Sequence, residues 1–138
     1  MAANTTPIYT LTPNITVGQT IATANTAKDG TGTVVTVFTA GTNGAKPEGV
    51  IFRGIGTNVA TVARIFINNG STNATATNNT LFAEITLAAT TLSEVGALAD
   101  YRYQFPDNLR LPNGYKILIT IGTTVAAGYA VTGYGGDY

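Results

Sequence analysis

The chain of 138 residues contains no cysteine, no histidine and no tryptophan. Without cysteine there is no disulfide framework and no thiol nucleophile. Without histidine, Ser-His-Asp and Cys-His triads and imidazole zinc sites are excluded as well. The chemistry still open to the chain is limited to carboxylate pairs, lysine–serine dyads and metal sites built from oxygen ligands.

Charge is scarce too, at 10% of the residues against a usual share of about 25%. Seven basic and seven acidic residues cancel, and no basic cluster offers a surface for nucleic acid or an anionic membrane. No uncharged apolar run approaches the roughly 18 residues of a membrane span. We therefore expect neither a nucleic-acid partner nor a membrane partner.

The first ten residues, MAANTTPIYT, lack a basic stretch followed by an apolar one. A secretory signal would need both. We therefore expect the protein to be made and assembled in the cytoplasm.

The acidic residues are scattered singly along the chain. Only Glu94 and Asp100 lie near each other, and their spacing fits neither an EF-hand nor a glycosidase motif. Ser93 has no lysine three residues later, and GIGTN at residues 54–58 lacks the third glycine and the helix of a dinucleotide-binding fingerprint. The sequence therefore predicts no catalytic residue, no cofactor and no metal ligand, and we interpret the protein as non-enzymatic.

Threonine, asparagine and glycine, set between short apolar runs, make up much of the rest. Threonine is β-branched and suits a half-exposed strand, whereas asparagine and glycine supply turns. In LFAEITLAA, at residues 81–89, Leu81, Ala83, Ile85 and Leu87 alternate with the opposite face, which is typical of a β-strand. The same alternation predicts strands at residues 33–39, 50–55, 60–67, 101–105, 115–121 and 129–134, with weaker candidates at 8–12 and 19–23.

Eight or nine short strands at intervals of about 8–12 residues predict an all-β, single-domain antiparallel β-sandwich of jelly-roll type. We expect the domain to cover residues 8–138 after a flexible arm at residues 1–7, and we expect the tail after Tyr134 to be flexible as well. Residues 91–100, TLSEVGALAD, interrupt the strand pattern. They indicate a crossover loop with a short 3₁₀ piece, or a helical turn.

The segment NNGSTNATATNNT, at residues 68–80, separates two of the best strand candidates. It predicts a long hairpin connection across which Arg64 and Glu84 pair. Asn69, Asn73 and Asn78 each begin an N-x-[ST] sequon, as do Asn4 and Asn14, and we attribute these matches to the abundance of threonine. As contact residues for a glycan or a neighbouring subunit, the three loop asparagines remain candidates.

Three tyrosines complete the candidate contact residues. Tyr101 and Tyr103 lie two residues apart and so share one face of a strand, while Tyr134 lies near the end of the chain. Exposed, such rings form a platform for stacking sugars; buried, they belong to the core or to a subunit contact. We favour packing for the first two, because Arg102 and Gln104 already supply the polar face.

The second half of the chain carries a specific resemblance. It runs from ARIFINNG and LFAEITLAATTLS, through LRLPNGYKILITI, to a final strand that closes with GGDY. The sequence resembles small virion structural proteins of tailed bacteriophages over roughly residues 50–138. The matching stretches are Arg64 to Gly70, Leu81 to Ser93, Leu109 to Ile121 and Tyr129 to Tyr138.

The resemblance implies a head decoration (cement) protein that binds the capsid surface and stabilises subunit junctions; a tail or collar component is the other virion role. The partners it implies are the major capsid protein or other virion subunits and further copies of the chain, with a trimer favoured. The alternative function is a carbohydrate-binding or adhesin module that recognises host-surface glycans through Tyr101, Tyr103, Tyr134 and the asparagine-rich loop. A glycan hydrolase ranks below both, because it needs a carboxylate pair.

Overall fold

The structure is a computed structural model that describes residues 9–138, so the arm predicted at residues 1–7 lies outside the described residues. None of the helical segments in residues 9–138 is long and apolar enough to cross a membrane. The regular elements are β1 (Thr12–Ile15), β2 (Gln19–Ile21), β3 (Val35–Thr39), β4 (Ala45–Gly54), β5 (Thr61–Asn68), the 3₁₀ turn η1 (Ala76–Asn78), β6 (Asn79–Leu87), β7 (Asp100–Gln104), β8 (Lys116–Ile121) and β9 (Tyr129–Asp137).

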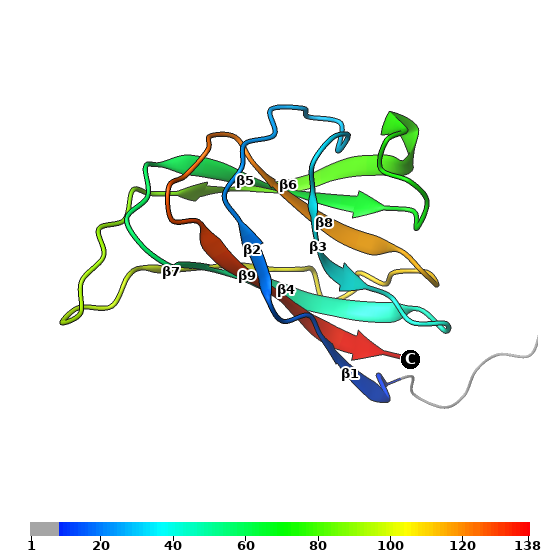
Figure 1. Cartoon of the computed structure of the whole chain (residues 1–138). Helices are drawn as coiled ribbons and strands as arrows, with labels where there is room; N and C mark the ends of the chain where they lie inside the picture. The colour runs from blue at the N-terminus through cyan, green and yellow to red at the C-terminus, as the bar shows by residue number, and fades with distance from the viewer. Residues whose placement is uncertain (1–8) are drawn as a thin grey trace, which may run out of the picture.

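Two antiparallel sheets pack face to face (Figure 1). Sheet A has the order β1-β9-β4-β7, and β2 also pairs with β9, beside β1 along the same edge. Sheet B has the order β3-β8-β5-β6. The all-β sandwich predicted from the alternation of apolar residues is confirmed.

The strand pairs are nested along the chain. The first strands, β1 and β2, pair with the last, β9; β3 pairs with β8, β4 with β7, and β5 with β6. Successive nested pairs go alternately to sheet A and sheet B, as in a long hairpin rolled up on itself. This arrangement is the jelly roll, which confirms the predicted fold type.

The core lies between the sheets and follows the predicted faces except at the start of β6, where Leu81 is exposed and Phe82 packs against the core. Ile117, Ile119 and Ile121 of β8 are fully buried and meet Val50 and Phe52 of β4 in one hydrophobic cluster. Each such side chain contributes about 1.5–3 kcal/mol relative to an exposed one. The alternation in β8 and β5 is therefore the main energetic reason why the two sheets face each other.

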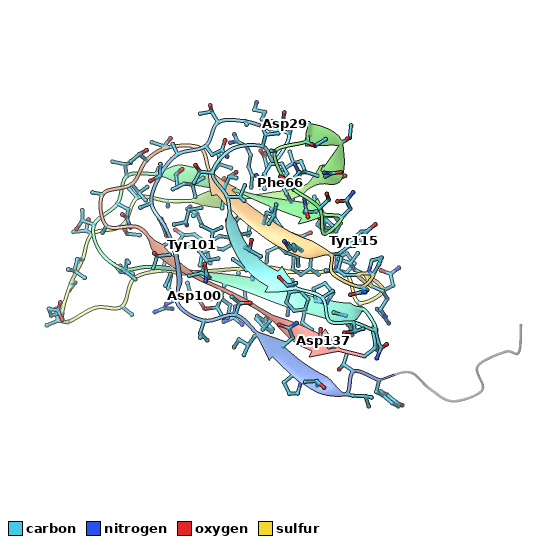
Figure 2. The ribbon with its side chains drawn as sticks, turned by 45° about the vertical axis from the view of Figure 1, so that its right-hand side comes forward. Asp29, Phe66, Asp100, Tyr101, Tyr115 and Asp137 are labelled. Carbon is cyan, nitrogen blue, oxygen red and sulfur yellow. The ribbon has the colours of Figure 1, made fainter. Side chains whose placement is uncertain are left out.

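The outer face of sheet B is covered as well. Phe66 and Leu118 point away from the core, yet they are at most 2% exposed. The connection between β2 and β3, residues 22–34, arches over this face, and Figure 2 places Asp29 of the connection above Phe66. Within residues 9–138 no segment covers sheet A in the same way, and Arg53 and Arg102 on its outer face are exposed. Sheet A is therefore the sheet that presents an open face to other molecules.

Besides shifts of one or two residues, three strands differ from the prediction. The first strand is Thr12–Ile15 rather than residues 8–12, and β4 begins at Ala45 rather than at the predicted residue 50. The tail predicted to be flexible after Tyr134 is strand, because Asp137 pairs with both Thr12 and Ala45. These segments are strands because they form backbone hydrogen bonds with one another, β1 and β4 pairing on either side of β9. The local pattern of apolar residues does not predict such pairing.

The connections differ in one respect. Residues 91–100 do form the crossover between the sheets, but the 3₁₀ turn lies at Ala76–Asn78 and not in the crossover. The segment from residue 68 to 80 is the predicted hairpin connection, since β5 and β6 on either side of it pair antiparallel.

Candidate contact surfaces

Exposed apolar side chains are concentrated in two places on the molecule. Among residues 9–138, nine large hydrophobic residues are exposed. Four belong to the stretch from Tyr9 to Val17, four belong to loops at the opposite end of β9, and Leu81 stands alone. We call the first group the terminal strip (Tyr9, Leu11, Ile15 and Val17) and the second the loop patch (Ile55, Val59, Leu92 and Val95).

The loop patch joins two segments that are far apart in sequence. A β-bridge pairs Asn58 with Thr90, with backbone hydrogen bonds of 3.1 and 2.9 Å in the two directions. Leu92 N–H then donates to the Thr57 hydroxyl at 3.0 Å. These bonds hold the loop before β5 against the crossover that follows β6, so the apolar side chains of both lie at one end of the sandwich.

A buried amide fixes the base of the patch. Asn58 is 4% exposed, and its side-chain oxygen accepts from Ala127 N–H and Gly128 N–H, both at 2.9 Å. Its amide nitrogen donates to the Gly128 carbonyl at 2.9 Å. The Thr90 hydroxyl donates to the Gly56 carbonyl at 2.8 Å. Since burying such groups without partners costs about 1–3 kcal/mol each, the loops are held rigidly here.

The tip of the crossover projects away from this base. Val95 is 100% exposed and Leu92 is 54% exposed, and the crossover extends beyond the two sheets in Figure 1. Glu94 is the one charged residue between residues 88 and 99. A projecting, nearly uncharged loop with apolar side chains is typical of a protein–protein contact.

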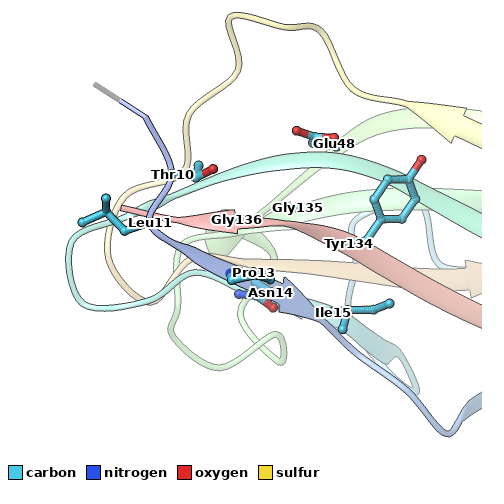
Figure 3. A pocket seen from close by; sticks show the side chains of 9 residues that line it. All are labelled: Thr10, Leu11, Pro13, Asn14, Ile15, Glu48, Tyr134, Gly135 and Gly136. Atoms are coloured by element: carbon cyan, nitrogen blue, oxygen red, sulfur yellow. The ribbon is translucent and has the colours of Figure 1, made fainter. Parts of the chain in front are cut away.

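The terminal strip borders an open groove on the outer face of sheet A (Figure 3). The groove has a volume of about 400 Å³. Leu11, at 82% exposed, and Ile15, at 61% exposed, line one side. The other residues of the lining are Thr10, Pro13, Asn14, Glu48, Tyr134, Gly135 and Gly136.

Tyr134 is the predicted tyrosine that lines this groove. Its ring lies across Gly49 of the neighbouring strand so closely that a side chain on Gly49 would overlap the phenol. The half-buried ring therefore lies against the sheet rather than standing upright from it. Beside it, Glu48 supplies the single charged group of the groove.

Tyr101 and Tyr103 lie on the inner side of β7. The Tyr103 ring meets Phe105 edge-on at a centroid distance of 5.3 Å and Phe82 at 6.4 Å. The Tyr101 hydroxyl accepts from Ala88 N–H at 3.2 Å. Both rings thus close the gap between β6 and β7, where the two sheets have their free edges.

The three loop asparagines use their amides within the molecule. Asn73 donates to the carbonyls of Gly30 and Gly32 at 3.1 and 2.8 Å, which fastens the β5–β6 loop to the cover of sheet B. Asn78 donates to the Thr72 carbonyl at 2.8 Å, and Asn69 donates to the Asn78 side-chain oxygen at 3.1 Å. The structure does not bring these asparagines together with the three tyrosines.

Three charged side chains on the outer face of sheet A form ion pairs with one another. Asp100 lies 2.9 Å from Arg102 and 3.7 Å from Arg53, and the hydrogen bond from Arg102 lowers the pKa of its carboxyl below the usual value. On sheet B, the predicted pair of Arg64 and Glu84 is present at 2.9 Å. Within residues 9–138, no group of three acidic, histidine or cysteine residues is placed to hold a metal ion.

The loop patch is absent from the contact residues predicted from the sequence. Ile55 is the last residue of a predicted strand, and Val59, Leu92 and Val95 lie in segments that the strand pattern leaves between strands. The only available signal was the occurrence of Leu92 and Val95 in a loop with little charge. Comparison of the chain with protein family models, curated proteins and solved structures found no match in any of the three.

Proposed function

We propose that this protein is a non-enzymatic structural component of a bacteriophage virion, a head decoration protein that ties neighbouring capsid subunits together. The bacteriophage origin rests on the resemblance of residues 50–138 to virion proteins. The proposal that the protein links capsid subunits rests on the distribution of exposed apolar side chains over the jelly roll.

The observation that carries this function is the position of the loop patch relative to the terminal strip. The loop patch lies at the start of β9, where Ile55 N–H donates to the Gly128 carbonyl at 3.1 Å. The terminal strip begins at the other end of β9, beside Asp137. Because β9 has nine residues, it spans roughly 27 Å. Two apolar surfaces at opposite ends of one rigid strand suit a protein that contacts two neighbours at once.

We assign the capsid contact to the loop patch. Its side chains project outward from loops, so they can enter depressions in another protein's surface, whereas the terminal strip lies along β1 and the residues on either side of it. The near absence of charge favours a partner surface that is itself apolar and uncharged. Engaging several capsid subunits through one oligomer adds avidity to each of these small contacts.

The test is co-sedimentation of the purified protein with capsids of the encoding virus assembled without it. Leu92→Ser combined with Val95→Ser should weaken binding at least tenfold, equivalent to about 1.4 kcal/mol, while leaving folding unchanged because both side chains are exposed. Leu81→Ser is the matched control, since Leu81 is exposed but lies in neither surface. Failure of the unaltered protein to sediment with capsids would refute the proposed function.

A second function, recognition of host-surface glycans, is favoured by one observation. Tyr134 lies flat in an open groove beside the carboxylate of Glu48, and an aromatic ring with a neighbouring acceptor suits a sugar. A glycan array decides between the two. Binding to one sugar class that is abolished by Tyr134→Ala, without capsid binding, would replace the decoration role by the glycan-binding role.

A further inference from the structure

We propose that residues 9–17, which include β1, are exchanged between copies of this chain, so that β1 of one copy pairs with β9 of a second. The proposal rests on the proposed function, which calls for an oligomer, and it names the segment that forms the contact. The exchanged partner is a second copy of the same chain.

The first reason is that β1 is attached to the domain almost entirely through its backbone. None of its four residues is buried: Thr12, Pro13 and Ile15 are exposed, and Asn14 is half-buried. Among the described residues, the only side-chain hydrogen bonds from β1 come from Asn14, which donates to the Thr39 carbonyl at 2.8 Å and to Asp137 at 3.0 Å. Detaching β1 therefore exposes no core, and segments with few buried contacts are the first to open.

The second reason is a hinge at the right place. Ile15 pairs with Tyr134 and Gln19 pairs with Val131, so the chain uses four residue steps where β9 uses three. The extra residue forms a bulge between β1 and β2. Within it Gly18 has a φ of +76°, and a side chain there would have no neighbour within 4 Å. Rotation at Gly18 can therefore redirect β1 without disturbing β2, which remains paired with β9.

The third reason is that the free edge of β1 is blocked against simple strand addition. Thr16 N–H donates to the Gly133 carbonyl, so alternate residues direct their backbone toward β9 and those between, including Pro13, face outward. Proline has no N–H to offer an incoming strand, and it is a common device against edge pairing. A second copy can thus pair with β9 by replacing β1, but not by extending the sheet beyond it.

Exchange remakes every contact of β1 in the other copy, so the contacts themselves cost nothing overall. The gain comes from bringing two copies together at the terminal strip, whose members Tyr9, Leu11, Ile15 and Val17 are all more than 60% exposed in a single copy. The groove beside Tyr134 would then have one wall from each of two chains.

The test uses engineered cysteines as the only thiols, since the chain has none. Ile15 and Tyr134 are directly opposite on the outer face and form a pair without mutual hydrogen bonds, whose Cα atoms lie about 4.5 Å apart, within disulfide range. Ile15→Cys with Tyr134→Cys is oxidised in the native protein and run on a non-reducing denaturing gel. Exchange predicts covalent dimers or larger chains that collapse to monomer on reduction.

The matched control is Thr20→Cys with Ala130→Cys. This pair has the same outward register but lies beyond Gly18, on β2, and should crosslink within one chain only. Monomers with an internal disulfide in both variants would overturn the exchange. That result would leave capsid binding intact, so the two proposals can fail separately.

A second measurement tests the exchange even if the double variant fails to fold. Differently tagged Ile15→Cys and Tyr134→Cys chains, each carrying one exposed or half-exposed substitution, are unfolded, mixed, refolded and oxidised. Exchange predicts a covalent pair carrying both tags, in excess over pairs of like tags. Absence of the mixed pair would overturn the proposal.

Discussion

At the scale of single residues, asparagine side chains form the hydrogen bonds that hold the loops together, a role that charged side chains have in many proteins. Asn25 donates to the carbonyls of Thr31 and Thr33, Asn58 joins the loop before β5 to the loop before β9, and Asn73 joins the β5–β6 loop to the β2–β3 connection. Each amide offers two donors and an acceptor to loop backbone that would otherwise lack partners. The asparagine-rich composition therefore reflects loop geometry more than glycan attachment.

Tyr129 gives a pH dependence at this scale. It is fully buried, and burial first, with the neighbouring Tyr101 second, raises the pKa of its phenol above the usual 10.0. A raised pKa means that the folded state favours the neutral phenol, so this contribution to stability is present below pH 10 and is lost as the pH rises above it.

Tyr129→Phe should therefore be less stable than the unaltered protein at neutral pH, by about 1 kcal/mol, because the hydroxyl's hydrogen bond to the Ala88 carbonyl is lost. The difference should shrink as the pH rises above 10. Denaturant midpoints measured from pH 8 to 11 check this, with Tyr9→Phe, 74% exposed, as control. Parallel curves for the unaltered protein and Tyr129→Phe would show that the buried phenol has no part in alkaline unfolding.

At the scale of elements, the sequence was sufficient wherever apolar residues alternate without interruption, as in β5 and β8, where Ala63 and Ile119 lie on the predicted core faces. The prediction was wrong at the start of β6, where Leu81 is exposed and Phe82 packs against the core, because a bulge between Ile65 and Phe66 of β5 shifts the register. β1 and the ends of β4 and β9 escaped prediction, because Pro13, Pro47 and Gly135 carry no strand signal. Their conformation comes from the partner strands, which only the nested topology specifies.

The glycines of β9 lie where the backbone or a side chain of a neighbouring segment comes too close to leave room for a side chain. A side chain on Gly133 would overlap the Val37 carbonyl of β3, which belongs to the opposite sheet. Gly133→Ala should therefore destabilise the protein by about 1–3 kcal/mol through overpacking. Urea unfolding measures this.

The control for that substitution is Gly96→Ala, whose new methyl group would meet only the Ser93 hydroxyl at 3.7 Å. We expect a change within about 0.5 kcal/mol there. Equal effects of the two substitutions would mean that the approach of β9 to β3 is not close in solution.

At the scale of the whole molecule, the jelly roll brings together surfaces that no local pattern predicts. Residues 55–59 and 92–95 meet only because the Asn58–Thr90 bridge lies between them. The three tyrosines predicted as contact residues differ in their positions for the same reason. Tyr134 lines an open groove, whereas Tyr101 and Tyr103 pack between β6 and β7 at one edge of the sandwich. Which side of a strand faces solvent depends on strand order, and the sequence does not contain that directly.

The most direct measurement of the decoration role is the temperature at which capsids of the encoding virus rupture, followed by calorimetry with and without the protein. We predict that saturating protein raises the rupture temperature, and that Leu92→Ser with Val95→Ser at the same concentration raises it much less. An unchanged rupture temperature at full occupancy would contradict the claim that the molecule ties capsid subunits together.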